Sequence, residues 1–309
     1  MDTLLILLIA LVIDIILGEA PNRFHPVAWL GSFINCVFRL APEKGKKKQL
    51  TFGVPAVLGT VALFTCSLSL VTFQLQAINH VIYIIVASCL LKNTFSIRGL
   101  WKAVGDVKTC LAANKINDAR MKVRSLVQRD TNALSKSHVI SAAIESCAEN
   151  ICDSFVAPLF YFAIFGLPGA IAYRIINTLD AMIGYHGNWE YTGKFAARLD
   201  DIANYIPARI SAFLIVIASA MTGNSVKQSW CVMSRDHKKT ESPNAGWTMS
   251  AMAGSLGVEL EKVGHYRIGD NHRALTPSLI ANSQLVMLTA AALWSTFIMI
   301  EEAACCVMR

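Results

Sequence analysis

Charge is scarce in this chain. Asp, Glu, Lys and Arg make up 16% of its 309 residues, against about 25% in soluble domains, while hydrophobic residues reach 54% and the mean hydropathy is +0.46. These values exclude an ordinary soluble domain and predict an integral membrane protein. The nine cysteines are scattered without a Cys-x-x-Cys pair, which predicts free thiols in a reducing compartment rather than a disulfide framework or a structural zinc site.

Several motifs are also missing. No Gly-x-x-x-x-Gly-Lys-Ser/Thr loop occurs, so a P-loop is excluded. Basic residues do not alternate with an aromatic platform, so no nucleic-acid partner is expected, and the net charge of +7 is instead typical of basic cytoplasmic loops in a membrane protein. No small-residue cleavage site follows the first apolar segment, which predicts a retained anchor rather than a signal peptide.

The chain does contain a series of apolar segments, at residues 3–17, 52–73, 77–91, 155–173, 210–222 and 285–300. About 20 apolar residues are enough to span a bilayer as a helix. The basic residues 43–48 are expected in the cytoplasm, and the mixed residues 92–144 have the spacing of cytoplasmic amphipathic helices. The sequence therefore predicts an all-α, multi-pass integral membrane protein, folded as one membrane-embedded domain over residues 1–309.

The predicted topology does not close if every apolar segment crosses the membrane. Residues 174–204 would then lie on the opposite side from the other polar segments, although residues 174–209 carry several Lys and Arg that resist export. We therefore predict that residues 155–173 and 205–222 are re-entrant or interfacial. Their Pro and Gly residues and short lengths allow this where protein covers the backbone.

Three acids in the segment ESCAENICDS are spaced for one helical face. Glu145, Glu149 and Asp153 follow one another at i+4 steps, where like charges repel by about 0.2–0.5 kcal/mol per pair. No Lys or Arg stands at i±4 within the stripe, so a positive ligand is expected. Mg²⁺ commonly takes one or two carboxylates together with substrate phosphates, and the stripe is therefore a candidate metal site as well as a candidate catalytic site.

A second polar cluster follows the first apolar segment. Asp14, Glu19, Arg23 and His25 stand at its end, and a buried Asp is costly in a membrane. One interpretation is a functional site, and the other is an interfacial Asp that reaches water.

The remaining clusters combine acids, amides and arginines beside apolar sequence. One recurs at helical spacing in two consecutive segments, with Arg174, Asn177 and Asp180 in the first and Arg198, Asp200, Asp201, Asn204 and Arg209 in the second. Asp and Asn suit a metal or an amine, and the planar fork of Arg suits phosphate or carboxylate. Residues 242–270 are rich in Gly, and backbone N–H groups in such loops can cradle anions, which makes Asn244 and Gly246 candidates for cofactor binding.

These clusters, in this order, resemble the adenosylcobinamide-phosphate synthase family of cobalamin biosynthesis (the CobD/CbiB type). The resemblance rests on LGEAPNRFHPVAWLG, ESCAENICDSFVAPLFY, GLPGAIAYRIINTLDAMIGY, ARLDDIANYIPARI and PNAGWTMSAMAGSLGVELEK, and it runs from about residue 14 to about residue 269. One departure is Ala20, where the family more often has Pro. The resemblance implies a multi-pass membrane enzyme that forms an amide between aminopropanol, or its O-phosphate, and a carboxylate of adenosylcobyric acid, with ATP and Mg²⁺.

That implied ligase reaction gives the candidate residues their expected roles. The stripe would hold Mg²⁺ or guide the amine, Arg174, Arg198 and Arg209 would clamp phosphates, and Asp180, Asp200 or Asp201 would complete the metal shell or act as base. A corrinoid would bind at the membrane surface against Trp29, Tyr173 and Tyr185. The resemblance also implies a cell-membrane location, and it allows association with other cobalamin-pathway enzymes. Basic residues flank Glu149, Asp200 and Asn244, and ATP is cytoplasmic, so the active site is expected on the cytoplasmic side.

Two other functions remain open from the residues alone. A membrane phosphotransferase of the CDP-alcohol type also carries Asp-rich helices beside lipid, but its Asp-Gly-x-x-Ala-Arg spacing is absent here, and LDDIAN is the nearest match. A transporter would use intramembrane acids as ion sites, although the repeated halves expected of a transporter are not evident. The sequence does not decide whether the amine is phosphorylated, which carboxylates bind metal, or the oligomeric state.

Overall fold

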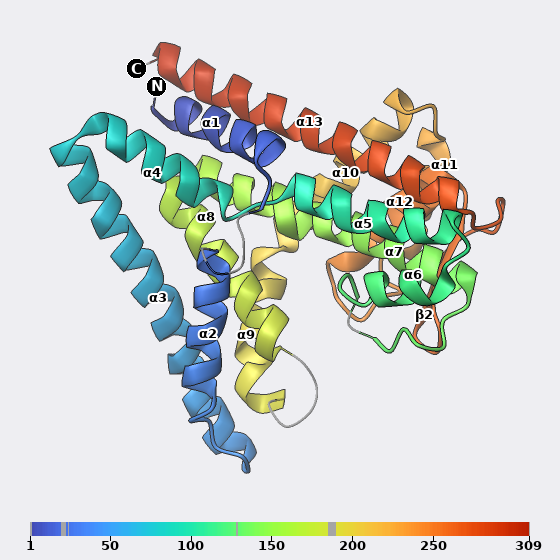
Figure 1. Ribbon diagram of the computed structural model, residues 1–309, viewed down its shortest axis with the longest axis horizontal. Coiled ribbons are helices and arrows are strands. Elements are labelled where there is room, and N and C mark those ends of the chain that lie inside the picture. The colour runs from blue at the N-terminus through green and yellow to red at the C-terminus, as the bar shows by residue number, and fades with distance from the viewer. Residues whose placement is uncertain (1, 20–22, 24, 128, 185–189, 309) are drawn as a thin grey trace. The chain divides into compact units, whose positions relative to one another are not determined.

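The computed structural model describes residues 2–19, 23, 25–127, 129–184 and 190–308 (Figure 1). The helices are α1 (Asp2–Ile16), α2 (Pro26–Phe38), α3 (Lys46–Ile78), α4 (His80–Lys92), α5 (Ile97–Ala112), α6 (Ile116–Val123), α7 (Lys136–Ile151), the π-helical turn η2 (Cys152–Val156), α8 (Ala157–Ile183), α9 (Glu190–Ala203), α10 (Tyr205–Met221), α11 (Val226–Asp236), α12 (Ala245–Leu256) and α13 (Pro277–Met308). Two short strands, β1 (Glu259–Lys262) and β2 (Tyr266–Gly269), form a hairpin.

The prediction of an all-α, multi-pass membrane protein is confirmed. Within the described residues, the helical segments that are long and apolar enough to cross a membrane are Lys46–Ile78, His80–Ala112, Lys136–Ile183 and Pro277–Ala304, and α9 with α10 makes a fifth if the pair is one span. The first apolar segment forms α1, which has 15 residues and is about 22 Å long. Because a bilayer core is about 30 Å thick, α1 is too short to cross it upright.

The chain divides into two compact units. Unit 1 comprises Met1–Ser96, Ala157–Ala203 and Ile298–Arg309, and unit 2 comprises Ile97–Val156 and Asn204–Phe297. Both units draw on distant parts of the sequence, so neither folds from one continuous stretch. The expectation of one membrane-embedded domain over residues 1–309 stays a prediction.

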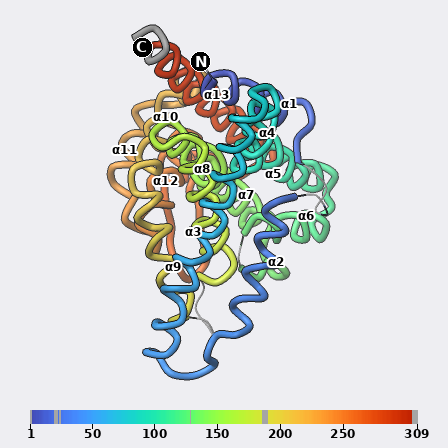
Figure 2. Tube along the Cα trace, turned by 90° about the vertical axis from the view of Figure 1, so that its left-hand side faces the viewer, coloured from blue at the N-terminus to red at the C-terminus, as the bar shows by residue number. Residues whose placement is uncertain are grey.

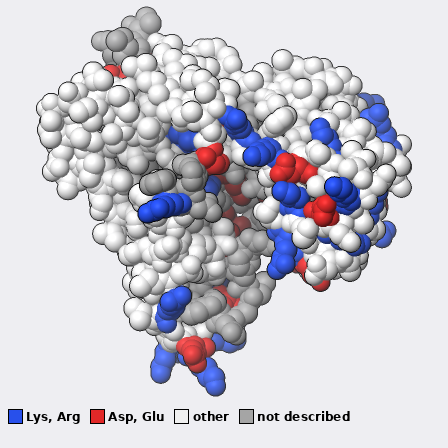
Figure 3. All heavy atoms as spheres, in the orientation of Figure 1, with Lys and Arg blue, Asp and Glu red and all other residues white. Residues whose placement is uncertain are grey.

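In unit 1, α1 lies beside α4, and α3 packs against α8 and α9 (Figures 1 and 2). Only 11% of the most apolar stretch of α3 is buried inside the protein. Large side chains such as Leu63, Leu70 and Phe73 face outward, and Figure 3 shows a broad surface without charged side chains over α4 and the adjoining end of α3. An apolar face of this size is suited to lipid rather than to water.

Two glycines in unit 1 let helices approach backbone to backbone. A Cβ on Gly53 of α3 would collide with the carbonyl oxygen of Thr192, and a Cβ on Gly193 of α9 would collide with that of Ile183. Small residues at helix contacts are typical of membrane proteins, because they allow close van der Waals packing.

The helix α8 reverses direction at Gly166. This residue has φ 67° and ψ −160°, a conformation open mainly to glycine, and Pro168 follows it. The rings of Tyr161 and Tyr173 stack with centroids 5.3 Å apart, whereas residues twelve positions apart in a continuous helix are separated by about 18 Å. The two halves of α8 therefore run back along each other, an arrangement suited to the predicted re-entrant segment at 155–173.

In unit 2, α12 packs against α10, α11 and α7, and the hairpin lies against α7 (Figure 1). Helix α7 begins at a Ser135 N-cap whose hydroxyl accepts a hydrogen bond from the amide of His138, a common helix start. The hairpin pairs Glu259 with Gly269 and Lys262 with Tyr266. The sequence predicts only a Gly-rich loop in this region, whereas the structure forms a hairpin there.

Candidate functional site

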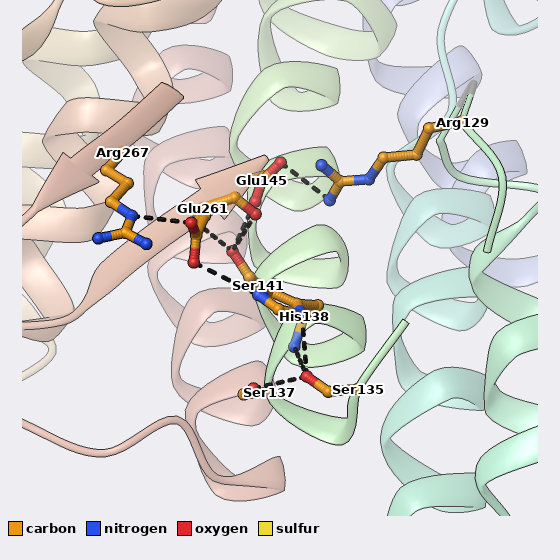
Figure 4. Close-up of polar contacts among 8 residues, drawn as sticks. All are labelled: Arg129, Ser135, Ser137, His138, Ser141, Glu145, Glu261 and Arg267. Atoms are coloured by element: carbon orange, nitrogen blue, oxygen red, sulfur yellow. Dashed lines mark hydrogen bonds and ion pairs between the residues drawn. The ribbon is translucent and has the colours of Figure 1, made fainter. Parts of the chain in front are cut away.

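Glu145 is the most enclosed acid of the predicted stripe, with 4% of its surface exposed. Its Oε1 accepts a hydrogen bond from the Ser141 hydroxyl at 2.5 Å, and its Oε2 accepts one from the Tyr266 hydroxyl at 2.9 Å and one from Arg129 Nη2 at 3.2 Å. Arg129 and Ser141 reach the carboxylate from different directions (Figure 4). A buried carboxylate needs this combination of a counter-charge and hydrogen bonds.

The interpretation of the stripe as lacking a basic partner is wrong for Glu145. Arg129 lies between α6 and α7, sixteen positions before Glu145, and pairs with it. Helical spacing predicts only partners on the same helix, and Arg129 comes from the preceding connection. The charge of Glu145 is therefore already balanced within the protein.

Tyr266, the first residue of β2 in the hairpin, contacts Glu145. Burial and the nearby charge of Glu145 raise the pKa of Tyr266, so the phenol keeps its proton and donates it in the hydrogen bond. Ser141 also joins α7 to the hairpin, because its hydroxyl accepts a hydrogen bond from the backbone N–H of Glu261 at 2.8 Å. The hairpin thus supplies one side of the Glu145 site.

Glu261 links the two strands of the hairpin to each other and the hairpin to α7. The Glu261 carboxylate lies 2.7 Å from Arg267 Nε and 3.3 Å from His138 Nε2 (Figure 4), and the Arg267 hydrogen bond is the main cause that lowers the pKa of Glu261.

At the other end of the hairpin, the fully buried Asp236 of α11 accepts a hydrogen bond from the Gly269 amide at 2.9 Å. Burial alone would raise the pKa of Asp236. Hydrogen bonds from Arg235, Lys239 and Gly269 outweigh the burial and hold the pKa well below its usual range.

The other two acids of the stripe, Glu149 and Asp153, are half-buried. Asp153 lies in η2, where i→i+5 hydrogen bonding widens the turn, so the i+4 alignment expected from the sequence does not continue to that residue. In the part of the chain that the structure describes, no three His, Cys, Asp or Glu side chains converge as metal ligands. The assignment of Glu145, Glu149 and Asp153 to a metal stays a prediction.

A second cluster in unit 2 brings together Arg209 and Asn244, which were predicted from separate motifs. Arg209 Nη1 donates to Asn244 Oδ1 at 2.9 Å and to the Tyr205 carbonyl at 2.6 Å. The guanidinium lies 3.6 Å from the Tyr205 ring centre and 4.9 Å from the Trp247 ring centre, so cation–π contacts hold it on two sides.

Gly246 directly precedes Trp247 of this cluster. A Cβ at Gly246 would collide with the His237 carbonyl oxygen and the Thr240 hydroxyl. Asn204 is buried, and its Oδ1 lies 3.7 Å from Cys152 Sγ.

In unit 1, α8 and α9 bring their predicted polar residues together. Asn177 Nδ2 donates to Asp200 Oδ1 at 3.3 Å. Asp180 and Asp201 lie close enough for their charges to repel, and the charge of Arg198 acts favourably on Asp201. Arg174 is half-buried on the same half of α8. The candidates therefore divide between the units, with Arg174, Asn177, Asp180, Arg198, Asp200 and Asp201 in unit 1 and Glu145, Glu149, Asp153, Asn204, Arg209, Asn244 and Gly246 in unit 2.

The interpretation of Asp14 as an interfacial acid that reaches water is wrong. Asp14 is fully buried, and its Oδ1 lies 3.4 Å from Lys92 Nζ, which also donates to Glu19 at 2.8 Å. Glu19 Oε2 lies 2.7 Å from His25 Nε2. Burial would raise the pKa of Glu19, but the hydrogen bonds with His25 and Lys92 outweigh it and hold that pKa at about 2.

The aromatic residues expected to line a corrinoid site behave differently from one another. Trp29 is 58% exposed and remains available for such a contact, whereas Tyr173 is 1% exposed and stacks on Tyr161. The expectation that Tyr173 lines a surface site is therefore wrong. Tyr185 lies outside the described residues.

The sequence of this chain was compared with those of known protein families and proteins. Residues 7–291 match the protein family described as CobD/Cbib protein. The chain belongs to this family. A cobalamin biosynthesis protein CobD of Dehalococcoides mccartyi is 48% identical over 294 residues, which cover 95% of this chain and 96% of that relative.

Archaeal relatives also match at nearly full length. A probable cobalamin biosynthesis protein CobD of Methanothermobacter thermautotrophicus is 40% identical over 299 residues, covering 94% of this chain and 97% of the relative. One of Methanocaldococcus jannaschii is 38% identical over 288 residues, covering 90% and 92%. No solved structure matches this chain.

In this CobD/Cbib chain, the sequence blocks that carry the resemblance coincide with the polar clusters. ESCAENICDSFVAPLFY runs from α7 through η2 into α8, and PNAGWTMSAMAGSLGVELEK runs from the Arg209 contact at Asn244 through α12 into β1. Arg129 lies outside these blocks. Ser141 and Tyr266 of the Glu145 site also lie outside them, and the helical spacing gave no signal for Arg129.

Proposed function

We propose that this chain is an enzyme of cobalamin biosynthesis, an ATP- and Mg²⁺-dependent ligase that joins aminopropanol, or its O-phosphate, to a carboxylate of adenosylcobyric acid. The observation that carries the proposal is the CobD/Cbib match over residues 7–291, together with relatives named cobalamin biosynthesis protein CobD over nearly their whole length. The buried charged clusters of a membrane protein support it, since such residues usually mark a site of function.

The reaction needs an activated carboxylate. A carboxylate oxygen of the corrinoid attacks the γ-phosphorus of ATP, the bond to the ADP oxygen breaks, and an acyl phosphate forms. The neutral amine then attacks the acyl carbon, its C–N bond forms, and the C–O bond to phosphate breaks. One proton leaves the nitrogen, and inorganic phosphate and ADP are released beside the amide.

The carboxylates fit Mg²⁺ as a nucleotide complex rather than as an all-protein cage. Since no three acidic, His or Cys side chains converge among the described residues, substrate oxygens and water must supply the other ligands, which is the usual arrangement for Mg²⁺. Glu149 and Asp153, which are half-buried, would hold the ion. When bound, Mg²⁺ would neutralise phosphate charge and orient the nucleotide.

The remaining roles follow from the chemistry of each side chain. Arg174, Arg198 and Arg209 would hold anionic groups, because a guanidinium matches phosphate and carboxylate with a fixed fork of donors. Asp180, Asp200 or Asp201 would take the amine proton. The repulsion between Asp180 and Asp201 favours a proton or a cation beside them.

The enzyme would work at the cell membrane with its active site in the cytoplasm, where ATP is available. Its partners would be the corrinoid, the amine and membrane lipid, and association with other enzymes of the pathway is part of the same proposal. The apolar outer face of α3 supports contact with lipid.

A ligation assay tests the proposal. Purified protein in lipid nanodiscs is incubated with adenosylcobyric acid, ATP, Mg²⁺ and either aminopropanol or its O-phosphate, and products are identified by mass spectrometry. The expected result is an amide product that requires ATP and Mg²⁺, with one ADP formed per amide. Transfer of a phosphoalcohol group from a CDP-alcohol, or substrate transport into proteoliposomes without an amide product, would instead support one of the alternative functions.

A further inference from the structure

Arg129 has a buried donor that no described residue accepts. Its side chain is 14% exposed, and its hydrogen bond within the described part of the chain runs from Nη2 to Glu145. The Nε atom is buried and has no hydrogen-bond partner among the described residues. Buried polar atoms almost always have a partner, so an orphaned donor points to a group that is bound there in use.

The surroundings hold the Arg129 guanidinium in one orientation. Glu145 accepts its Nη2 hydrogen bond, and the same carboxylate is fixed by Ser141 and Tyr266. Ser141 is in turn fixed by the Glu261 amide. A charged group held in this way loses little conformational freedom when a ligand binds, which favours affinity.

Neutralising Glu145 does not account for this arrangement by itself. An arginine that serves only as a counter-ion usually pairs with its carboxylate through two short bonds of about 2.7–2.9 Å. Here one bond is made, at 3.2 Å. Lys262 lies close enough to act on the charge of Glu145, so this carboxylate has a second positive neighbour, and the Nε side of Arg129 remains available.

We infer that Arg129 binds an oxyanion, a phosphate or a carboxylate, of one of the substrates, and that Glu145 and Tyr266 are positioning residues for it. The inference rests on the proposed function, because ATP and adenosylcobyric acid carry such a group in that reaction, as does the amine if it is phosphorylated. Arg129 adds a fourth anion-binding arginine to those predicted from the sequence. It also gives Glu145 a role other than metal binding.

Binding without turnover tests the inference separately from the ligase reaction. The thermal unfolding temperature of the full chain in nanodiscs is measured against inorganic phosphate, ATP and adenosylcobyric acid, each alone. The wild type is expected to be stabilised in a saturable way by at least one of them. In Arg129→Gln the apparent Kd for that ligand should rise about ten- to a hundredfold, as for the loss of one charged hydrogen bond.

Arg124→Gln is the matched control, because Arg124 is an exposed arginine in the same connection between α6 and α7 and is expected to bind like the wild type. The ligand whose effect Arg129→Gln removes identifies the source of the oxyanion. Unchanged binding of all three ligands by Arg129→Gln, or no saturable stabilisation of the wild type, would overturn the inference. Either result can occur in an active ligase, so failure here is distinct from failure of the proposed function.

A double variant removes the ambiguity of misfolding. Arg129→Gln alone leaves Glu145 buried without its main counter-charge, whereas Arg129→Gln with Glu145→Gln removes both charges of the pair. The double variant should recover much of the unfolding temperature but not the ligand-dependent shift. Recovery of both would show that Arg129 only neutralises Glu145 and would overturn the inference.

Discussion

Two Glu→Gln substitutions one helical turn apart should have opposite effects. Glu145→Gln keeps the size of a side chain that accepts three hydrogen bonds with 4% of its surface exposed. The amide nitrogen of Gln is a donor and would face at least one of the donors Arg129, Ser141 or Tyr266. Breaking a buried ion pair by removing one partner costs about 3–5 kcal/mol, so this variant should be clearly less stable.

Glu149→Gln should leave folding intact. Glu149 is half-buried, and the substitution removes a like-charge repulsion of about 0.2–0.5 kcal/mol per pair. If Glu149 is a Mg²⁺ ligand, the variant should lose most of its ligase activity and need more Mg²⁺ for what remains. The two acids would then be separated into one that supports the fold and one that serves the reaction.

The assay measures both quantities on the same nanodisc preparations. Unfolding is followed by circular dichroism against temperature, and ligation is measured over a range of Mg²⁺ concentrations. The reasoning is refuted if Glu145→Gln unfolds with the wild type, or if Glu149→Gln has wild-type activity and Mg²⁺ dependence.

Three further predictions follow from the structure. Asp236→Asn should lower the free energy of unfolding at neutral pH by about 2 kcal/mol through loss of charged hydrogen bonds. Because the folded-state pKa of Asp236 is depressed, this stability is present above about pH 4, the pKa of the unfolded state, and is lost as the pH falls further. The free energy of unfolding measured against pH should therefore depend less on acid in the variant than in the wild type, and parallel curves would contradict the assignment. Arg174→Lys and Arg198→Lys should each raise the KM for ATP or the amine phosphate about ten- to a hundredfold, with near-normal abundance of the protein in the membrane. Normal kinetics with reduced abundance would show that both residues have a structural role instead. Single cysteines placed beside Asp200 and Asn244 in a Cys-free background should resist an impermeant thiol reagent applied outside intact cells, and labelling beside Asp200 would contradict the re-entrant topology.

The membrane class and much of the secondary structure could be predicted from the sequence because apolar length and helical spacing are local properties. The apolar segment 52–73 lies in α3 and 285–300 lies in α13. The Pro and Gly residues of 155–173 also predicted a break in this apolar segment, and the chain reverses there at Gly166. That prediction needed only backbone chemistry that glycine and proline carry themselves.

The partners of buried charges could not be predicted in the same way. Glu145 pairs with Arg129 from a preceding loop and with Tyr266 from a hairpin, and Asp14 meets Lys92 across a helix contact. Such contacts are set by tertiary packing, so helical spacing carries no trace of them.

The hairpin itself had a weak signal that the sequence analysis did not use. Leu260 and Ile268 each stand between polar or small residues, and the turn between the two strands contains Gly264. Short alternating segments around such a turn are typical of a hairpin, although four residues in each strand are too few to distinguish it from a loop.

The most direct measurement of the central claim is the fate of the corrinoid carboxylate oxygen. Adenosylcobyric acid labelled with oxygen-18 in its free carboxylate is ligated by the purified protein, and the inorganic phosphate is analysed by mass spectrometry. Activation as an acyl phosphate predicts one labelled oxygen in the phosphate for each amide formed. Amide formation with unlabelled phosphate, or no amide at all from either amine, would contradict the account.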